Sequence, residues 1–186
     1  MENRTKTVAV YCASRTGAKD IYMEQAFALG QALAKAGWRI VYGGSISGLM
    51  GAMANGALES GGHVIGVYPP FIEDKEILHP NLTELYPVAS MAERKTLMEK
   101  LSIGSISLPG GSGTMDEFFE VITNKAIGAG DHQFSILHNV DGFYDPLQLF
   151  FTKMKDEGFL SSQTINMWHC ERNIQALIAR MESFIN

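Results

Sequence analysis

The feature that most constrains the fold is a regular alternation of short β-rich runs with helical patterns, in which two strand-to-helix turns are rich in glycine. Strands are expected at residues 7–13, 38–42, 63–68, 82–86, 103–108 and 134–138. Helices are expected at residues 20–36, 52–60, 91–101, 115–127, 145–157 and 173–185, with Asp20 as the N-cap of the first. The run at 134–138 is the last clear strand, and the remainder is predicted to be helical.

This alternation predicts one Rossmann-like α/β domain over residues 1–186, with a parallel sheet that carries helices on both faces. In such sheets, ligands bind beyond the carboxyl ends of the strands. The two glycine-rich turns, at residues 43–51 and 109–114, should therefore lie together at that edge.

Composition narrows the classes of partner. The net charge of −5 disfavours nucleic acid, because binding to a phosphate backbone needs a basic face. Cys12 and Cys170 lack metal-ligand spacing and the five histidines are scattered, so no metal site is expected. The polar first residues lack a signal-peptide pattern and no apolar run is long enough to cross a bilayer, so we expect a cytoplasmic protein without a membrane partner.

The turn Pro109-Gly-Gly-Ser-Gly-Thr114 has the composition of a phosphate-binding loop. Glycine lets backbone N–H groups approach a phosphate closely, and the helix that follows points its free N–H groups and positive dipole end at the same place. No lysine follows the glycines, so this is not a Walker A loop, and a monophosphate fits better than a triphosphate. A tight turn that merely needs glycine is the alternative interpretation.

The other turn, Tyr42-Gly-Gly-Ser-Ile-Ser-Gly-Leu-Met-Gly51, also joins a strand to a helix. It lacks the G-x-G-x-x-G spacing, and no acidic residue ends the next strand to hold a ribose, so dinucleotide binding is disfavoured.

Two pairs of adjacent charged residues are further candidates for the site. Asp116 and Glu117 lie in the first turn after the phosphate loop, where carboxylates also occur simply because they suit the helix dipole. Beside an anion site, one of them could orient water or stabilise positive charge. Arg94 and Lys95 begin another helix, where cations oppose the dipole and therefore suggest an anionic partner; a solvated surface pair is the alternative.

Together these clusters resemble one family, the "Lonely Guy" cytokinin riboside 5′-monophosphate phosphoribohydrolases, whose members were often labelled "lysine decarboxylase". The family signature P-G-G-x-G-T-x-x-E is matched by residues 109–117, and its upstream companions by residues 42–51 and by Glu93-Arg-Lys95. Residues 139–146 also resemble the family, and the likeness runs from about Val8 to Leu160.

The resemblance implies hydrolysis of the N-glycosidic bond of a purine nucleoside 5′-monophosphate, whose base is adenine or an N6-substituted adenine, without a cofactor. It also implies a homodimer formed through the helices at 91–101 and 115–127, and these helices carry more apolar side chains than one face of a sheet needs, which favours the same interface. Arg94 and Glu117 would be the catalytic pair. The residues expected to bind the nucleotide are Gly43, Gly44, Glu76, Arg94, Lys95, Gly110, Gly111, Ser112, Gly113, Thr114, Met115, Asp116, Glu117 and Thr123.

The chain also departs from the family pattern. It has Asn124-Lys-Ala-Ile-Gly128 where members usually have Trp-Ala-Gln-Leu-Gly, and its first strand ends Cys12-Ala-Ser-Arg15 where members usually have Cys-Gly-Ser-Ser. Two alternatives remain at this point: a nucleotide-binding sensor or carrier without turnover, and a pyridoxal-phosphate decarboxylase, for which Lys95 or Lys125 would have to form the Schiff base.

Overall fold

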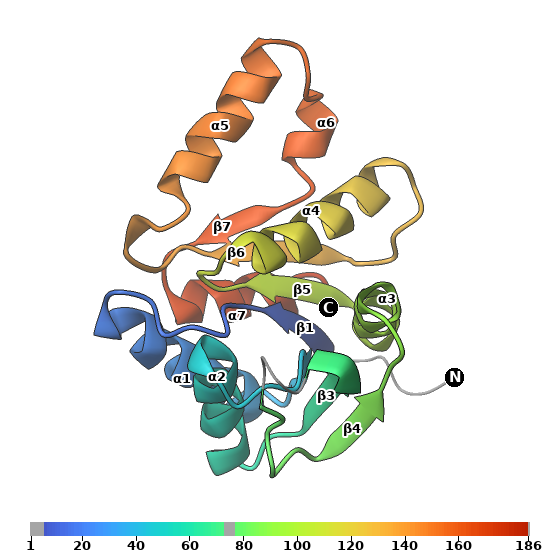
Figure 1. The fold of residues 1–186 in the computed structure, drawn as a ribbon. Helices are drawn as coiled ribbons and strands as arrows, with labels where there is room; N and C mark the ends of the chain where they lie inside the picture. Colours follow the sequence, from blue (N-terminus) through green and yellow to red (C-terminus); the bar gives the residue numbers. More distant parts are fainter. Residues whose placement is uncertain (1–5, 73–76, 186) are drawn as a thin grey trace.

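Seven parallel strands form one sheet in the order β4-β3-β2-β1-β5-β6-β7, in a computed structural model that describes residues 6–72 and 77–185 (Figure 1). The strands are β1 (Thr7–Tyr11), β2 (Arg39–Tyr42), β3 (Val64–Tyr68), β4 (Glu84–Pro87), β5 (Gly104–Ser107), β6 (Phe134–His138) and β7 (His169–Glu171). The helices are α1 (Asp20–Lys35), α2 (Gly48–Glu59), α3 (Met91–Leu101), α4 (Ser112–Ala126), α5 (Asp145–Asp156), α6 (Ser162–Ile165) and α7 (Ile174–Glu182), with short 3-10 helices η1 (Pro70–Ile72) and η2 (Val140–Gly142).

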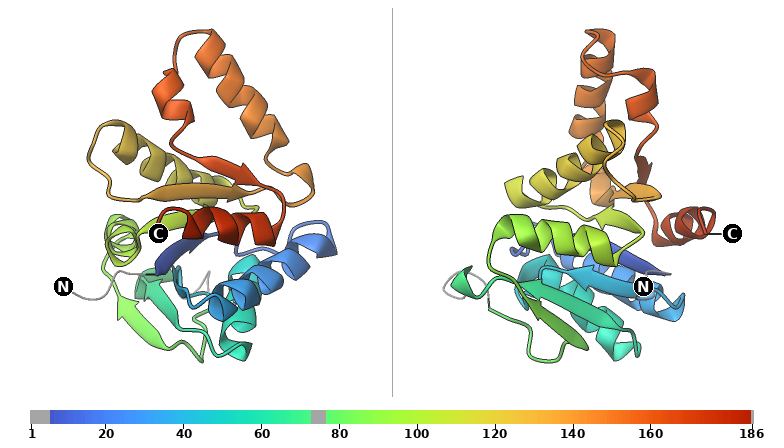
Figure 2. Two further views of the ribbon diagram at one scale, coloured as in Figure 1. Left: turned by 180° about the vertical axis from the view of Figure 1, so that it is seen from behind. Right: turned by 90° about the vertical axis from the view of Figure 1, so that its right-hand side faces the viewer.

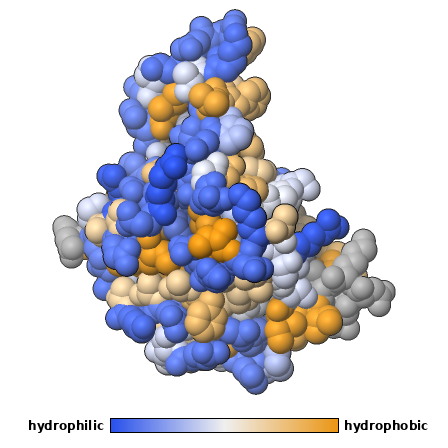
Figure 3. All heavy atoms as spheres, turned by 90° about the vertical axis from the view of Figure 1, so that its left-hand side faces the viewer, coloured by the Kyte–Doolittle hydropathy of each residue, from blue (hydrophilic) through white to orange (hydrophobic). Residues whose placement is uncertain are grey.

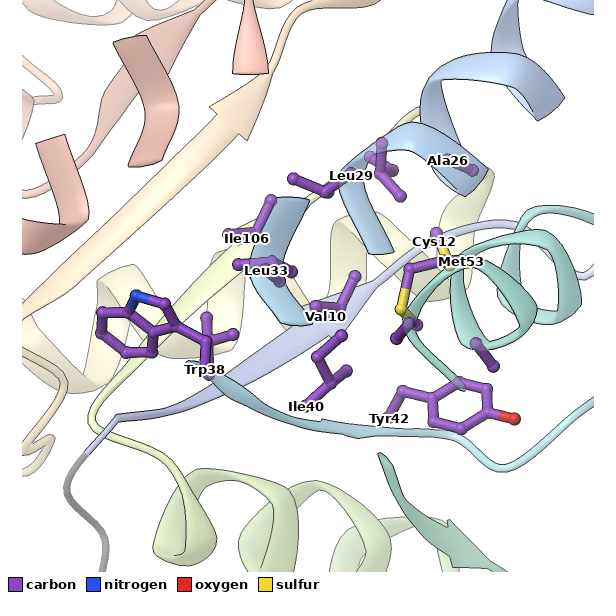
Figure 4. Packing of buried hydrophobic residues seen from close by; sticks show 14 of the residues in the cluster. Val10, Cys12, Ala26, Leu29, Leu33, Trp38, Ile40, Tyr42, Met53 and Ile106 are labelled. Atoms are coloured by element: carbon purple, nitrogen blue, oxygen red, sulfur yellow. The ribbon is translucent and has the colours of Figure 1, made fainter. Parts of the chain in front are cut away.

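The side chains of the central strand β1 alternate between two hydrophobic cores, as a strand that is buried on both faces requires. Val8 and Val10 pack with α1, α2 and α7 on one face, and Figure 4 shows this packing from close by. Ala9 and Tyr11 pack with α3 and α4 on the other face. The predicted parallel sheet with helices on both faces is therefore confirmed.

The chain order places a crevice beside β1. From β1 the chain moves outward through β2 and β3 to β4, and then returns to β5 on the other side of β1. Where the order reverses, the loops that follow β1 and β5 leave the sheet in opposite directions, and open α/β sheets bind ligands at this point.

Beyond β6, helices α5 and α6 project from the body of the molecule (Figures 1 and 2). A third hydrophobic cluster fixes the base of this projection, which we call the α5–α6 arm. In it, Phe151 of α5 stacks on Trp168 with ring centroids 4.1 Å apart, and both rings contact Phe118 of α4. No helix in the described ranges is both long enough and apolar enough to cross a membrane.

Several details differ from the expectations, among them the start of α4, which is Ser112 rather than residue 115. The strand β7 was not expected, because its three residues, His-Cys-Glu, are half-buried at the sheet edge and carry no apolar pattern. The helix α2 begins at Gly48 rather than after Gly51, and a Cβ on Gly51 would lie only 1.7 Å from the carbonyl oxygen of Ile46. Asp20 is the first residue of α1 and not its N-cap, which is Lys19.

Candidate active site

A pocket of about 610 Å³ opens at the carboxyl ends of β1, β2 and β5, where the loops after these strands meet the first turns of α3 and α4. The structure brings most of the expected site residues together on its walls. They are Gly43, Arg94, Lys95, Gly110, Gly111, Ser112, Gly113, Thr114, Asp116 and Glu117.

Other expected residues are not on these walls. Gly44 lies against Tyr68, because a Cβ on this glycine would be 3.3 Å from the Cβ of Tyr68. Met115 packs against the third hydrophobic cluster. The Thr123 side chain is exposed, because a residue six positions after Glu117 lies about 240° further around a helix of 3.6 residues per turn. Glu76 lies outside the described residues.

The glycine-rich loop at residues 109–114 meets the requirements for binding an anion. The N-cap of α4 is Gly111, which has no side chain to cap the helix, and the first helical N–H···O bond of α4 runs from Met115 to Gly111. The N–H groups of the first turn therefore face the pocket with the positive end of the helix dipole. The side chain of Thr114 is buried against the loop, and a Cβ on Gly110 would lie only 2.1 Å from its Oγ1.

The loop is held from behind by residues of the 139–146 motif. The buried Tyr144 donates its hydroxyl to the carbonyl oxygen of Leu108 at 2.6 Å, directly before Pro109. Asn139 fixes this tyrosine, since its side chain accepts from the Tyr144 N–H at 2.7 Å and donates to Asp145 at 2.7 Å. Residues 139–146, which resemble the family, thus hold the loop at residues 109–114 in place.

Arg94 is buried, with 4% of its surface exposed. Its Nε donates to the carbonyl oxygen of Val67 at 3.1 Å and its Nη2 to that of Gly43 at 2.6 Å, so the ends of β2 and β3 fix the guanidinium at the pocket wall. Ser90 caps the first turn of α3, because its Oγ accepts a hydrogen bond from the Glu93 N–H at 3.1 Å. The Glu93 carboxylate in turn accepts from the Ala89 N–H at 2.7 Å. This cap places Arg94 four residues into the helix.

Lys95 joins α3 to α4. Its ammonium forms ion pairs with Glu120 and with Asp116, the latter at 2.9 Å. Hydrogen bonds to Glu120 and then to Asp116 raise the pKa of Lys95, which therefore carries its charge at neutral pH. Much of the positive charge of Lys95 is already compensated by α4.

Glu117 is half-buried and shares the pocket wall with Thr114, because residues three apart lie on one face of a helix. Tyr11 lies on the same wall and is buried. Burial first, and then the negative charge of Glu117, raise the pKa of Tyr11 well above its ordinary value. The phenol therefore stays protonated beside the carboxylate.

Several pocket residues were not expected from the sequence. They include Arg15 and Tyr22 on the α1 side and Phe143 of the 139–146 motif, whose ring packs edge-to-face with Tyr22 at 6.0 Å. These residues meet at the pocket only in the folded chain, and their spacing along the sequence forms no recognisable motif.

Lys125, a Schiff-base candidate in the decarboxylase alternative, is not on the pocket wall and donates to the carbonyl oxygen of Met167 at 3.1 Å. In the described ranges, no group of three His, Cys, Asp or Glu side chains could hold a metal ion.

The fold and the pocket define a Rossmann-like α/β protein with an uncapped, glycine-rich helix N-terminus at the switch point of its sheet. Comparison with known proteins identifies the family: the chain belongs to the family described as "Possible lysine decarboxylase", whose model matches residues 50–181. The resemblance stated from the motifs is thereby confirmed.

Curated relatives match over nearly the whole chain. The cytokinin riboside 5′-monophosphate phosphoribohydrolase LOG5 of Arabidopsis thaliana is 37% identical over 184 residues, which are 99% of this chain and 80% of that protein. The cytokinin riboside 5′-monophosphate phosphoribohydrolase of Rhodococcoides fascians is 40% identical over 179 residues, which are 96% of this chain and 90% of that protein.

Solved structures share the fold at lower sequence identity. The molybdenum cofactor binding protein from Rippkaea orientalis superposes with a TM-score of 0.73 at 19% identity, covering 98% of this chain and 99% of that one. The Moco carrier protein from Chlamydomonas reinhardtii gives a TM-score of 0.73 at 21% identity, covering 98% of both chains. These two likenesses concern the fold alone.

Proposed function

We propose that the protein hydrolyses the N-glycosidic bond of a purine nucleoside 5′-monophosphate, with adenine or an N6-substituted adenine as the base. One observation carries the proposal: a half-buried carboxylate, Glu117, stands one helical turn beyond an uncapped glycine-rich loop in the same pocket. The loop suits a phosphate, and the carboxylate suits the positive charge that grows on a ribose as its bond to the base breaks. The names of the curated relatives support the same reaction.

The reaction consumes one water molecule. The N9–C1′ bond breaks with its electron pair going to the base, water adds its oxygen to C1′, and the proton lost by water balances the one gained by the base. The products are the free base and ribose 5-phosphate. Glu117 stabilises the oxocarbenium-like ribose and orients the water, which is the role of a carboxylate in glycoside hydrolysis generally.

Arg94 stabilises the negative charge that develops on the departing base. Because backbone carbonyls of Val67 and Gly43 fix its guanidinium, the charge is preorganised and needs no reorientation during the reaction. The phosphate loop binds a part of the substrate remote from the reacting bond, which aligns C1′ with Glu117. The ion pairs of Lys95 hold α3 against α4, and they therefore keep Arg94 on α3 at a constant distance from Glu117 on α4.

Release of ribose 5-phosphate from AMP and from an N6-substituted AMP, with adenosine as the comparison, tests the proposal. We expect both monophosphates to be cleaved and adenosine to be left almost intact. Glu117→Gln should retain nucleotide binding and lose turnover by roughly two decades or more, since it removes a charge used in the transition state. Glu157→Gln, an exposed position at the end of α5, is the matched control and should remain fully active.

The assay also separates the competing functions. Binding of AMP without release of ribose 5-phosphate would identify a sensor or carrier. An absorbance band of a bound pyridoxal group in the pure protein would favour the decarboxylase. Wild-type turnover by a folded Glu117→Gln variant would remove the carboxylate from the mechanism.

We further propose that the protein is cytoplasmic and forms a homodimer. Within the monomer, Met98, Phe118 and Ile122 of α3 and α4 are buried in its own cores, so they are not available to a partner, contrary to the expectation that they exceed the needs of the sheet. Exposed large apolar side chains on or beside α3, α4 and the α5–α6 arm include Met91, Ile127, Leu149, Phe150 and Phe159. Figure 3 shows hydrophobic residues interrupting the hydrophilic surface of the arm. The arm therefore supports an interface that extends beyond α3 and α4.

A further inference from the structure

Within the described part of the chain, three cationic side chains line the pocket: Arg15, Arg94 and Lys95. Two of them already have strong partners. Arg94 donates to two backbone carbonyls, and Lys95 is paired with two carboxylates of α4. Neither has its charge fully available for an anionic ligand.

Arg15 differs from both. Its side chain is exposed to the pocket and, within residues 6–72 and 77–185, it makes no hydrogen bond or ion pair. A long cationic side chain on the wall of a pocket, without a protein partner, is available to a ligand.

The backbone that carries Arg15 is nevertheless held firmly. Ala13 donates its N–H to the carbonyl oxygen of Pro109 at 3.3 Å and accepts the N–H of Met50 at 3.2 Å, which ties the loop after β1 to the phosphate loop and to α2. A Cβ on Gly48 would lie 2.5 Å from the backbone nitrogen of Arg15, so this glycine is what allows the close packing. The backbone of Arg15 is therefore packed against the start of α2, two residues after the hydrogen bond that ties this loop to Pro109.

A cation at this position matches the charge of a nucleoside monophosphate. The N-terminus of a helix contributes roughly half a positive charge, whereas a phosphate monoester carries about −1.5 to −2 at neutral pH. Glu117 on the same wall adds further negative charge, whereas Asp116 is paired with Lys95. A guanidinium, which binds phosphate oxygens through two parallel N–H···O bonds, corrects this imbalance.

The position of Arg15 also orients the ligand. Arg15 follows β1 on the side of α1, while Arg94 and Lys95 enter from α3, which packs on the opposite face of the sheet. The phosphate loop follows β5, which is the neighbour of β1 in the sheet. A phosphate held by the loop and Arg15 leaves the ribose and the base to extend toward Arg94 and Glu117.

We propose that Arg15 binds the 5′-phosphate and strengthens the preference of the enzyme for nucleoside 5′-monophosphates over nucleosides. This inference rests on the proposed function, because it names the residue that recognises the phosphate of that substrate.

The test compares Arg15→Ala and Arg15→Lys with the wild type. We expect Arg15→Ala to raise KM for AMP by about 10- to 100-fold with little change in kcat, because charge-assisted hydrogen bonds to a phosphate are lost while Glu117 is untouched. Cleavage of adenosine, which has no phosphate, should remain at its wild-type level. The KM of Arg15→Lys for AMP should lie between those of the wild type and Arg15→Ala, since a lysine keeps the charge without the paired N–H groups. Arg180→Ala, on α7 away from the pocket, is the matched control and should behave as the wild type.

Binding of ribose 5-phosphate, measured by calorimetry, separates this inference from the proposed function because it needs no turnover. Weaker binding by Arg15→Ala supports the inference even if no nucleotide is cleaved, in which case only the proposed reaction fails. Wild-type KM and wild-type binding in Arg15→Ala would overturn the inference while leaving the hydrolase intact. An equal loss on AMP and adenosine would also overturn it, because that result would mark a general structural role.

Discussion

Substitution of Gly43 by alanine offers a test of how the active site is built. A Cβ at this position would lie 1.9 Å from Arg94 Nη2 and 2.8 Å from Cζ. The guanidinium must retreat by roughly 1.5 Å before it reaches ordinary van der Waals separation. The hydrogen bond from Nη2 to the carbonyl oxygen of Gly43, 2.6 Å long, is broken by this movement.

The structure sets the size of the effect. A displacement of about 1 Å in a catalytic group can reduce the rate by about 10²-fold, so we expect Gly43→Ala to lower kcat/KM for AMP by that factor or more, equivalent to roughly 2.7 kcal/mol. A hydrogen bond from a charged donor contributes about 1.5–3 kcal/mol. The free energy of unfolding, measured by urea denaturation, should therefore decrease by roughly 2 kcal/mol.

The control separates loss of stability from loss of geometry. Gly158, between α5 and α6, has φ +78°, and a Cβ at this position would have no other atom within 4 Å, so Gly158→Ala should lose about 1–2 kcal/mol through backbone strain alone. Its activity should be unchanged. A double-mutant cycle adds a second check: in an Arg94→Ala background the clash is absent, and Gly43→Ala should cost little further activity. Near wild-type kcat/KM in Gly43→Ala, or a full additional loss in the Arg94→Ala background, would refute the reasoning.

Three further predictions concern the support of the loop, the pH dependence and the assembly. Tyr144→Phe removes the hydroxyl that bonds to Leu108, and it should raise KM for AMP several-fold and lower the free energy of unfolding by about 1 kcal/mol in urea denaturation; unchanged values in both would exclude this support. Burial lowers the pKa of His138 below its ordinary value of 6.5, so the unfolded chain binds more protons below that pH and stability should fall as the pH drops below about 6.5. His138→Gln should reduce this slope in denaturation curves at several pH values, and an identical slope would assign it to other groups. Light scattering at micromolar concentration should give twice the 20.4 kDa chain mass for the wild type and a single chain mass for Phe150→Glu on the α5–α6 arm. Leu85→Glu, in the edge strand β4 away from the arm, is the control and should remain a dimer. A fully active wild-type monomer would contradict the dimer.

Much of the fold could be predicted because its signals are local. The residues of β1 are all buried and mostly apolar, and the glycines of the phosphate loop stand directly between a buried strand and an amphipathic helix. The edge strand β7 could not be predicted, because its pairing with β6 depends on a partner more than thirty residues away in sequence, as the register of Ile136 with His169 shows. Three half-buried residues contribute too little periodicity to compete with the helical patterns on either side.

The site shows the same division. Glu117 and Arg94 could be found from motifs, since each lies in a helix whose start is marked by a loop or a cap. Arg15 could not, because its loop reaches the phosphate loop only through the pairing of β1 with β5, whose partners, such as Val8 and Gly104, are nearly a hundred residues apart in sequence. The surplus of apolar residues on α3 and α4 was misjudged for a related reason: Met98 and Phe118 fill cores whose other walls are distant strands and the α5–α6 arm.

The hydrogen bond from Tyr144 to Leu108 has a thermodynamic consequence. Tyr144 directly precedes α5, so the same residue touches the phosphate loop and begins the α5–α6 arm. Coupling between two binding events is reciprocal: if occupation of the loop favours one position of the arm, then a partner that holds the arm in that position strengthens binding at the loop by the same factor. If the arm forms part of a subunit interface, association and nucleotide affinity are linked, and the apparent KM should decrease as the protein concentration rises through the dissociation constant of the dimer.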